Sequence, residues 1–443
     1  MIDVVIDATM NIPYSKHTLD NGLDVLIHED HSVPIVAVNL WYHVGSKNER
    51  PGHTGFAHLF EHLMFEGSEH HDSGFFQPLQ AAGAALNGST NADRTNYWEV
   101  VPSGELELAL WMESDRMGYL LPALTEKKFV NQRDVVLNER RQNYENRPYG
   151  MASLAMLAAL FPPDHPYHWS TIGEIADLRA ARVDEAHDFF RRYYHPSNAS
   201  LAIAGDIDPD AALALIRSYF EGIDPGAPVE RVRAEASLDG DRRILLEDRV
   251  ELPRLYLSWL TPPMFAEGDA ALDLAADVLA NGKTSRLYRR LVFDERIATD
   301  VSAAQNSREL CGFAQISATA APGHALPALE RVIVEEIDRL SSEGPTDDEI
   351  GRGRVQAETQ FIQRLQTVGG FGGKSDQLNA YNTFLGRPDY FNEDLRRYDR
   401  VTSDALRAAV GTYLRNTGRV TMSVVPRGRI DLAINESVPA NVL

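Results

Sequence analysis

The stretch "VPIVAVNLWY", residues 33–42, has a counterpart in "LPRLYLSWL", residues 252–260. Both are short apolar runs with aromatic residues, a pattern typical of buried strands. Two further pairs of similar segments recur at nearly the same spacing. The segment starting at Gly52 resembles the one starting at Gly268, and the segment starting at Val183 resembles the one starting at Val401. The offsets of the three pairs are 219, 216 and 218 positions, so the sequence indicates an internal duplication.

The duplication predicts two domains of one fold. In each copy the strands outnumber the crossover helices, which favours a mixed, mostly antiparallel sheet packed with helices on one face over a doubly wound parallel sheet. The predicted fold class is therefore α+β with two homologous domains. Gly, Pro and charged residues between the copies are typical of a linker. We predict a first domain at 1–225, a linker at 226–243 and a second domain at 244–443.

Composition excludes several classes of function. The chain has 443 residues, with 43 Lys and Arg against 64 Asp and Glu, a net charge of −21. This acidic balance argues against a nucleic-acid partner, because a protein that binds nucleic acid needs a basic face. The charge fits a solvated acidic surface or an attraction for basic peptides. Cys311 is the only cysteine, so a metal must be held by His, Asp or Glu. Without a signal-peptide pattern or a membrane span, we expect a cytoplasmic protein, or a periplasmic one if a leader was removed.

The segment "HLFEH", residues 58–62, carries the chemistry of the first copy. Residues four apart share a helix face, so His58 and His62 can direct both imidazoles at one zinc ion. Glu61 lies on the edge of that face and can take a proton from a water whose pKa zinc lowers to roughly 7. The order His-x-x-Glu-His is the inverted zinc motif. The 216-residue offset places Leu274, Asp277 and Val278 at these positions of the second copy, so the fold does not require the histidines.

A catalytic zinc site needs a third protein ligand, usually a carboxylate. The long helical segment "QRDVVLNERRQ" offers Glu139, with 76 residues between it and His62. Val135 and Val136, one turn earlier, are expected to point into the protein, so Glu139 is predicted to face inward as well. The sequence thus predicts a zinc site made by His58, His62 and Glu139, with Glu61 as the catalytic base.

This spaced motif resembles the pitrilysin or insulinase-type zinc peptidases, the inverzincin family that includes mitochondrial processing peptidase, and the chain is similar to its bacterial zinc-bearing subunits. The similarity extends to "NGSTNADRTNYWEVVP", "YHPSNASLAIAGDIDP" and "SRLYRRL". It implies a half-clamshell of two α+β domains, and the same roles for the four residues of the zinc site. It also implies that a peptide substrate adds as a strand to the edge segment containing Asn87, Gly88 and Ser89. A plain edge strand is the alternative for this segment.

Two departures from the family pattern bear on function. Gln132 stands where many members carry a second glutamate, which affects only the surroundings of the zinc ligands. Members of the family use an Arg and a Tyr, seven apart, to stabilise the oxyanion. Here Val292 and Thr299 occupy those positions and cannot supply the charge-assisted hydrogen bonds.

The missing pair predicts a partner. We expect a zinc-dependent endopeptidase subunit that forms a heterodimer with a homologous chain, which lacks zinc ligands and supplies the Arg/Tyr pair. The alternative is a structural or assembly subunit that keeps only the fold. The glycine-rich "VGGFGGKS", residues 368–375, fails the phosphate-loop pattern because Val368 stands at its first glycine position. We expect a flexible loop near the substrate cavity there.

Overall fold

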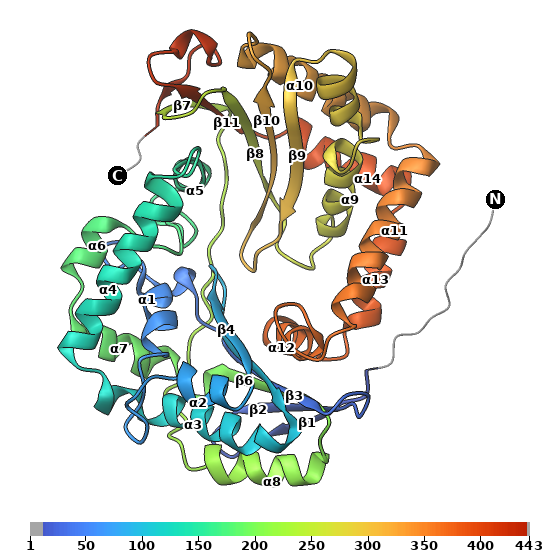
Figure 1. Ribbon diagram of the computed structural model, residues 1–443. Coiled ribbons are helices and arrows are strands. Elements are labelled where there is room, and N and C mark those ends of the chain that lie inside the picture. The colour runs from blue at the N-terminus through green and yellow to red at the C-terminus, as the bar shows by residue number, and fades with distance from the viewer. Residues whose placement is uncertain (1–11, 441–443) are drawn as a thin grey trace.

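The computed structural model describes residues 12–440 and contains two six-stranded sheets (Figure 1). The first sheet has the order β1-β2-β6-β3-β5-β4. Its strands are β1 Ser15–Thr18, β2 Asp24–Glu29, β3 Ile35–Tyr42, β4 Ala85–Thr90, β5 Thr95–Pro102 and β6 Ala199–Gly205. The pair β2 and β6 is parallel, and the other neighbours are antiparallel.

The second sheet repeats this plan with the order β12-β7-β11-β8-β10-β9. Its strands are β7 Arg242–Asp248, β8 Arg254–Thr261, β9 Ala298–Asn306, β10 Gly312–Ala320, β11 Val420–Pro426 and β12 Val438–Pro439. The parallel pair β7 and β11 matches β2 and β6, so the predicted duplication and the mixed, mostly antiparallel α+β fold are confirmed. Only one outer edge differs, because β12 comes from the end of the described chain and runs parallel to β7.

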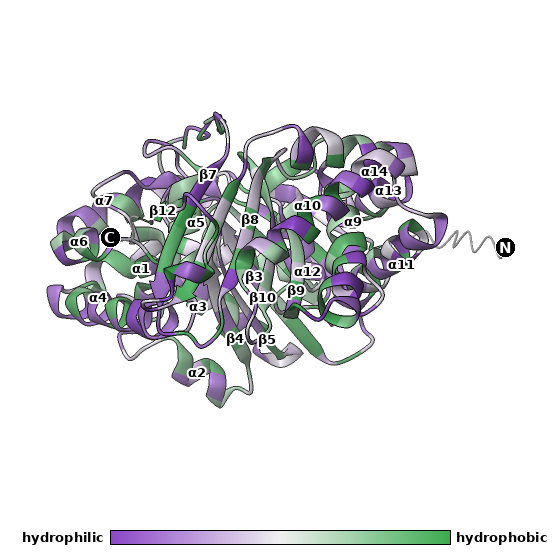
Figure 2. Ribbon diagram, turned by 90° about the horizontal axis from the view of Figure 1, so that it is seen from above, coloured by the Kyte–Doolittle hydropathy of each residue, from purple (hydrophilic) through white to green (hydrophobic). Residues whose placement is uncertain are grey.

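Helices surround both sheets, whose strands run through the middle of the molecule (Figure 2). The helices of the first half are α1 Phe56–Leu63, α2 Phe76–Ala81, α3 Leu106–Ala123, α4 Glu126–Arg140, α5 Ala152–Leu160, α6 Ile175–Ala180, α7 Val183–Tyr193 and α8 Pro209–Phe220. Those of the second half are α9 Asp269–Ala280, α10 Leu326–Glu343, α11 Asp347–Arg364, α12 Lys374–Leu385, α13 Phe391–Asp399 and α14 Ser403–Val410. Among residues 12–440, no helix is long and apolar enough to cross a membrane.

Both faces of the first sheet are buried. Val36, Val38 and Leu40 alternate along β3 and pack into the core beneath α3 and α8. The residues between them, including Asn39 and Trp41, point to the opposite face. That second face is covered by α12, which comes from the other half of the chain (Figure 1).

The second sheet is covered in the reciprocal manner. Helix α5 of the first half packs against β8 and β11, where Ala152 and Met156 join an apolar cluster with Phe313 and Met422. The expectation of helices on one face of each sheet is therefore wrong. One helix of each half packs on the sheet of the other half, because each sheet has two apolar faces that must be removed from water.

The connection between the halves runs from Phe220 to Arg242, and the described residues between them contain no helix or strand. The linker predicted at 226–243 overlaps the start of β7 by two residues. We propose that the boundary between the domains lies in 221–241.

Candidate metal centre

Helix α1 is built to present two imidazoles on one face. Leu59 and Leu63 are fully buried in the core, while His58 and His62 lie one turn apart on another face. The helix starts after Gly55, whose φ of +90° suits glycine. The buried carboxyl of Glu49 accepts hydrogen bonds from the backbone N–H of Gly55 at 2.9 Å and of Ala57 at 2.8 Å. These bonds fix the first turn and hence the direction of both histidines.

Helix α4 brings Glu139 to the same point. It begins as expected after Thr125, whose side chain accepts a hydrogen bond from the backbone N–H of Lys128 at 3.3 Å. Val136 is fully buried, but Val135 is 44% exposed, so the prediction that both valines point inward is wrong for Val135. Glu139 lies one turn after the exposed valine and reaches α1 from the partly open side of α4.

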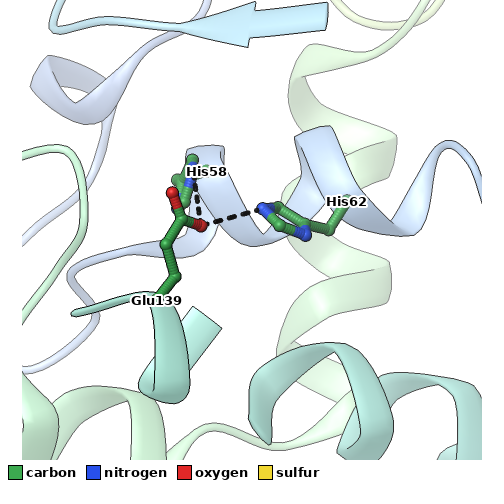
Figure 3. Close-up of side chains that lie close together, drawn as sticks. All are labelled: His58, His62 and Glu139. Carbon is green, nitrogen blue, oxygen red and sulfur yellow. Dashed lines mark ion pairs between the residues drawn. The ribbon is translucent and has the colours of Figure 1, made fainter. Parts of the chain in front are cut away.

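The three side chains fit a zinc ion. Oε2 of Glu139 lies 3.7 Å from Nε2 of His58 and 3.4 Å from Nε2 of His62, and the three donor atoms all lie within 4.8 Å of one another (Figure 3). In a tetrahedral site with bonds of about 2.0–2.1 Å, neighbouring donors are about 3.3 Å apart. Within residues 12–440, no other group of three or more His, Cys, Asp or Glu side chains meets this distance.

The protonation states also suit a metal. Burial and the neighbouring His62 lower the pKa of His58 to about 4, so its imidazole is neutral near pH 7. Burial alone would lower the pKa of His62, but a hydrogen bond to Glu139 and the charges of Glu61 and Glu139 raise it. The same hydrogen bond lowers the pKa of Glu139. The hydrogen bond between His62 and Glu139 thus favours the charged form of both groups, and a divalent cation can take the place of its proton.

Glu61 lies on the side of α1 that packs against the edge strand β4. Burial raises the pKa of Glu61, and the charges of His62 and Arg94 oppose this rise. A carboxylate with a raised pKa is a better proton acceptor, as a general base requires.

Amide side chains support the site from α4 and from the turn that follows it. Asn143 donates a hydrogen bond from Nδ2 to Oε1 of Glu139 at 3.2 Å, which holds the carboxylate in place. Gln132 donates a hydrogen bond to Glu66 just beyond the end of α1. Arg140, the residue after Glu139, is fully buried and donates a hydrogen bond to the carbonyl of Gly173.

Strand β4 forms one edge of the first sheet, beside α1. Gly88 is buried, and a Cβ atom there would meet the rings of Tyr97 and Phe65 at 3.1 and 3.2 Å. Its backbone N–H donates to Oδ1 of Asn87 at 2.8 Å, and the Oγ of Ser89 donates to Asn96 at 2.7 Å. The structure therefore places all three predicted substrate-binding residues on an edge strand next to the candidate metal ligands.

Arg94 was missed by sequence reasoning. Its Nη1 donates to the carbonyl of Ser89 at 2.9 Å and to the Oγ of Ser89 at 2.7 Å. Its guanidinium also lies 5.1 Å from the ring centre of Trp41. The available signal was its position in the turn "NADR", directly after the edge segment.

The second half has no charged donor at positions 292 and 299. Val292 packs against the second core, and Thr299 lies on β9 with its hydroxyl donating to Asp300 at 3.2 Å. The left-handed glycines that precede α1 and α9, Gly55 and Gly268, are 213 residues apart. When the two helices are aligned by these glycines, rather than by the 216-residue offset, the three candidate site residues of α1 correspond to Ala271, Leu274 and Ala275, which are all buried.

Comparison with known families explains this asymmetry. The first half matches the model for insulinase, peptidase family M16, over residues 24–162. A second match, to the model for the M16 inactive domain, covers residues 181–356, from α7 of the first half into the second half. The chain belongs to peptidase family M16. The first M16 match spans all four residues of the candidate site, whereas the second M16 match covers helix α9, where apolar residues stand in their place.

Other M16 proteins resemble the chain over nearly its whole length. It is 28% identical to the zinc protease PqqE of Helicobacter pylori, covering 92% of each chain. It is 26% identical to an uncharacterized zinc protease of Streptomyces coelicolor, covering 93% of this chain and 89% of that relative. The crystal structure of a protease from Helicobacter pylori matches with a TM-score of 0.86 and 25% identity, covering 94% of this chain and all of that one. An M16 inactive domain from Pseudomonas fluorescens shares the fold, with a TM-score of 0.83 and 17% identity.

Proposed function

We propose that this protein is a zinc-dependent endopeptidase subunit that hydrolyses extended peptides. The observation that carries the proposal is the convergence of His58, His62 and Glu139 at the spacing of a tetrahedral zinc site, with Glu61 beside it. Two relatives with similar coverage are named zinc proteases, which supports this reading.

The residues have distinct roles in this proposal. His58, His62 and Glu139 bind the ion, and Asn143 keeps the carboxylate oriented. Zinc would supply a Lewis acid that polarises the peptide carbonyl and acidifies water. Glu61 accepts the proton of the attacking water and passes it to the leaving amine.

Strand β4 is the proposed docking edge for the peptide. Antiparallel strands alternate between hydrogen-bonded and non-hydrogen-bonded pairs. The backbone N–H of Asn91 donates to the carbonyl of Arg94 at the turn, so the alternation directs the N–H and C=O groups of Leu86, Gly88 and Thr90 away from β5. An extended peptide can pair with these groups, displacing Oδ1 of Asn87 from the N–H of Gly88, and pass directly beside α1. The acidic balance of the chain favours basic peptides.

The proposed enzyme is completed by a partner. Val292 and Thr299 offer no charged donor for an oxyanion, and each is engaged within the second half. We propose a heterodimer with a homologous, zinc-free subunit that supplies an Arg/Tyr pair, and we expect a homodimer to be weak or inactive.

The decisive experiment compares the wild type, Glu61→Gln and the control Glu69→Gln, whose side chain is exposed. Zinc content and peptide hydrolysis are measured for each, with and without the homologous chain. We expect Glu61→Gln to retain zinc and lose about 10²- to 10⁴-fold in rate, the usual contribution of a general base, and we expect the control to behave as the wild type. Retained turnover in Glu61→Gln would contradict the role of Glu61. Equal rates with and without the partner would contradict the heterodimer. No hydrolysis with any partner would favour a structural subunit.

A further inference from the structure

The loop at 368–373, between α11 and α12, lies directly on the sheet that carries the proposed docking edge. Val368 packs with Ala37 and Ala204 in a small apolar cluster. A Cβ atom at Gly369 would lie 2.6 Å from both Ala37 Cβ and Val100 Cγ2, so only glycine allows this approach. The glycine-rich loop is therefore pressed against β3 and β5.

Hydrogen bonds hold this loop in one shape. Gly370 and Gly372 have φ values of +80° and +77°, which favour glycine. The backbone N–H of Gly372 donates to Oδ2 of the buried Asp376 at 2.7 Å. The backbone N–H of Lys374 donates to the carbonyl of Thr367 at 2.9 Å and closes the loop at its base.

The loop presents one aromatic side chain, Phe371, which is 51% exposed. Its ring packs edge-on against Trp98 of β5, with 5.4 Å between ring centroids. Trp98 pairs with Asn87 of the edge strand β4, and directly paired residues share one face of a sheet. Phe371 and Trp98 thus form an apolar surface beside the docking edge, on the face opposite to Gly88 and α1.

We infer that Phe371 and Trp98 form a subsite that selects a large apolar side chain in the substrate. In a peptide added to β4, alternate side chains point to opposite faces of the sheet. One set points toward α1 and the metal ligands. The other set points over Asn87 and Ser89 toward the two aromatic rings. Two strand spacings, about 10 Å, separate the backbones of β5 and the added peptide, and large side chains from both can meet across the small residues of β4.

This inference rests on the proposed peptidase function, so its test separates the two. Extended basic peptides are prepared in pairs that carry Phe or Ser at one position, and the position is moved along the peptide. We expect the wild type to prefer Phe at alternate positions on one side of the cleaved bond. Phe371→Ala is expected to lower kcat/KM for the preferred Phe peptides about tenfold, the scale of apolar pocket discrimination, and to leave the Ser peptides unchanged. Phe371→Leu is expected to keep most of the preference.

The control is Phe293→Ala, because Phe293 is 69% exposed and lies in the second half, between α9 and β9. A second measurement uses fluorescence anisotropy of the same labelled peptides on the Glu61→Gln protein with and without Phe371→Ala, and it needs no hydrolysis. If the wild type cleaves no peptide even with the homologous chain added, the proposed function fails while the binding measurement still tests the subsite. Equal effects of Phe371→Ala on Phe and Ser peptides, or no effect on either, would overturn the subsite.

Discussion

Replacing Asp376 with Ala is expected to loosen the contact between the two halves of the chain. Asp376 is 7% exposed and sits at the start of α12, against the first sheet. Its Oδ1 accepts hydrogen bonds from Trp41 Nε1 at 2.8 Å, Asn96 Nδ2 at 3.1 Å and Asn39 Nδ2 at 3.3 Å. Its Oδ2 accepts the backbone N–H of Gly372. One carboxylate therefore satisfies three buried side-chain donors and also holds the loop at 368–373 in place.

The cost follows from these donors. An unsatisfied buried donor costs about 1–3 kcal/mol, and hydration of the vacated space favours the lower end. Three side-chain donors then give a loss of about 3–5 kcal/mol in the free energy that docks α12. In Asp376→Asn the amide can keep its oxygen toward the sheet and lose only the bond to Gly372, so a loss of about 1–2 kcal/mol is expected.

Amide hydrogen exchange over 374–385, followed by mass spectrometry, measures the opening of α12 directly. Asp389→Ala is the control, because Asp389 is 61% exposed and its ion pair with Arg387 is 3.9 Å long, so it should cost less than about 0.5 kcal/mol. The reasoning is refuted if Asp376→Ala exchanges like the control, or if the Asn variant is as damaging as the Ala variant.

Three further predictions concern the site and the stability of both halves. Glu139→Gln should weaken zinc binding by more than the 10- to 100-fold typical of outer ligands, as measured by competition with a chelator; unchanged affinity would exclude Glu139 as a ligand. Burial raises the pKa of Asp273 from 3.8 to about 6, so the folded state holds its proton more tightly and ionisation costs roughly 3 kcal/mol. Asp273→Asn should therefore be more stable than the wild type above pH 6 and equal to it below about pH 4 in urea titrations; a gain that persists in acid would contradict this cause. Thr125→Ala should cost about 1 kcal/mol by removing the cap of α4, whereas Thr417→Ala, at an exposed position, should cost little in the same thermal melts.

Much of the site was predictable because its information is local. The spacing of His58 and His62 follows from the helical repeat alone, and the Thr125 cap is a short-range signal. The inward orientation predicted for Glu139 rested on two buried valines, and one of them, Val135, is exposed. Val135 and Val136 are adjacent apolar residues, and sequence alone did not show which one faces the core. The alignment of the repeat was similarly off by three residues at α1, because apolar residues dominate both helices and only the backbone conformation identifies the equivalent glycines.

The sequence by itself determined the duplication, the α+β class and the candidate metal ligands, because hydrophobic period and residue spacing encode these features. Only the tertiary structure decided that α5 and α12 exchange between the halves and that Phe371 lies beside the docking edge. Helix α12 buries three polar side chains, those of Asp376, Asn379 and Asn382. They are buried because Asn39, Ser200 and Asp24 on distant strands provide their hydrogen-bond partners. Such long-range pairing leaves no periodic signal along the chain.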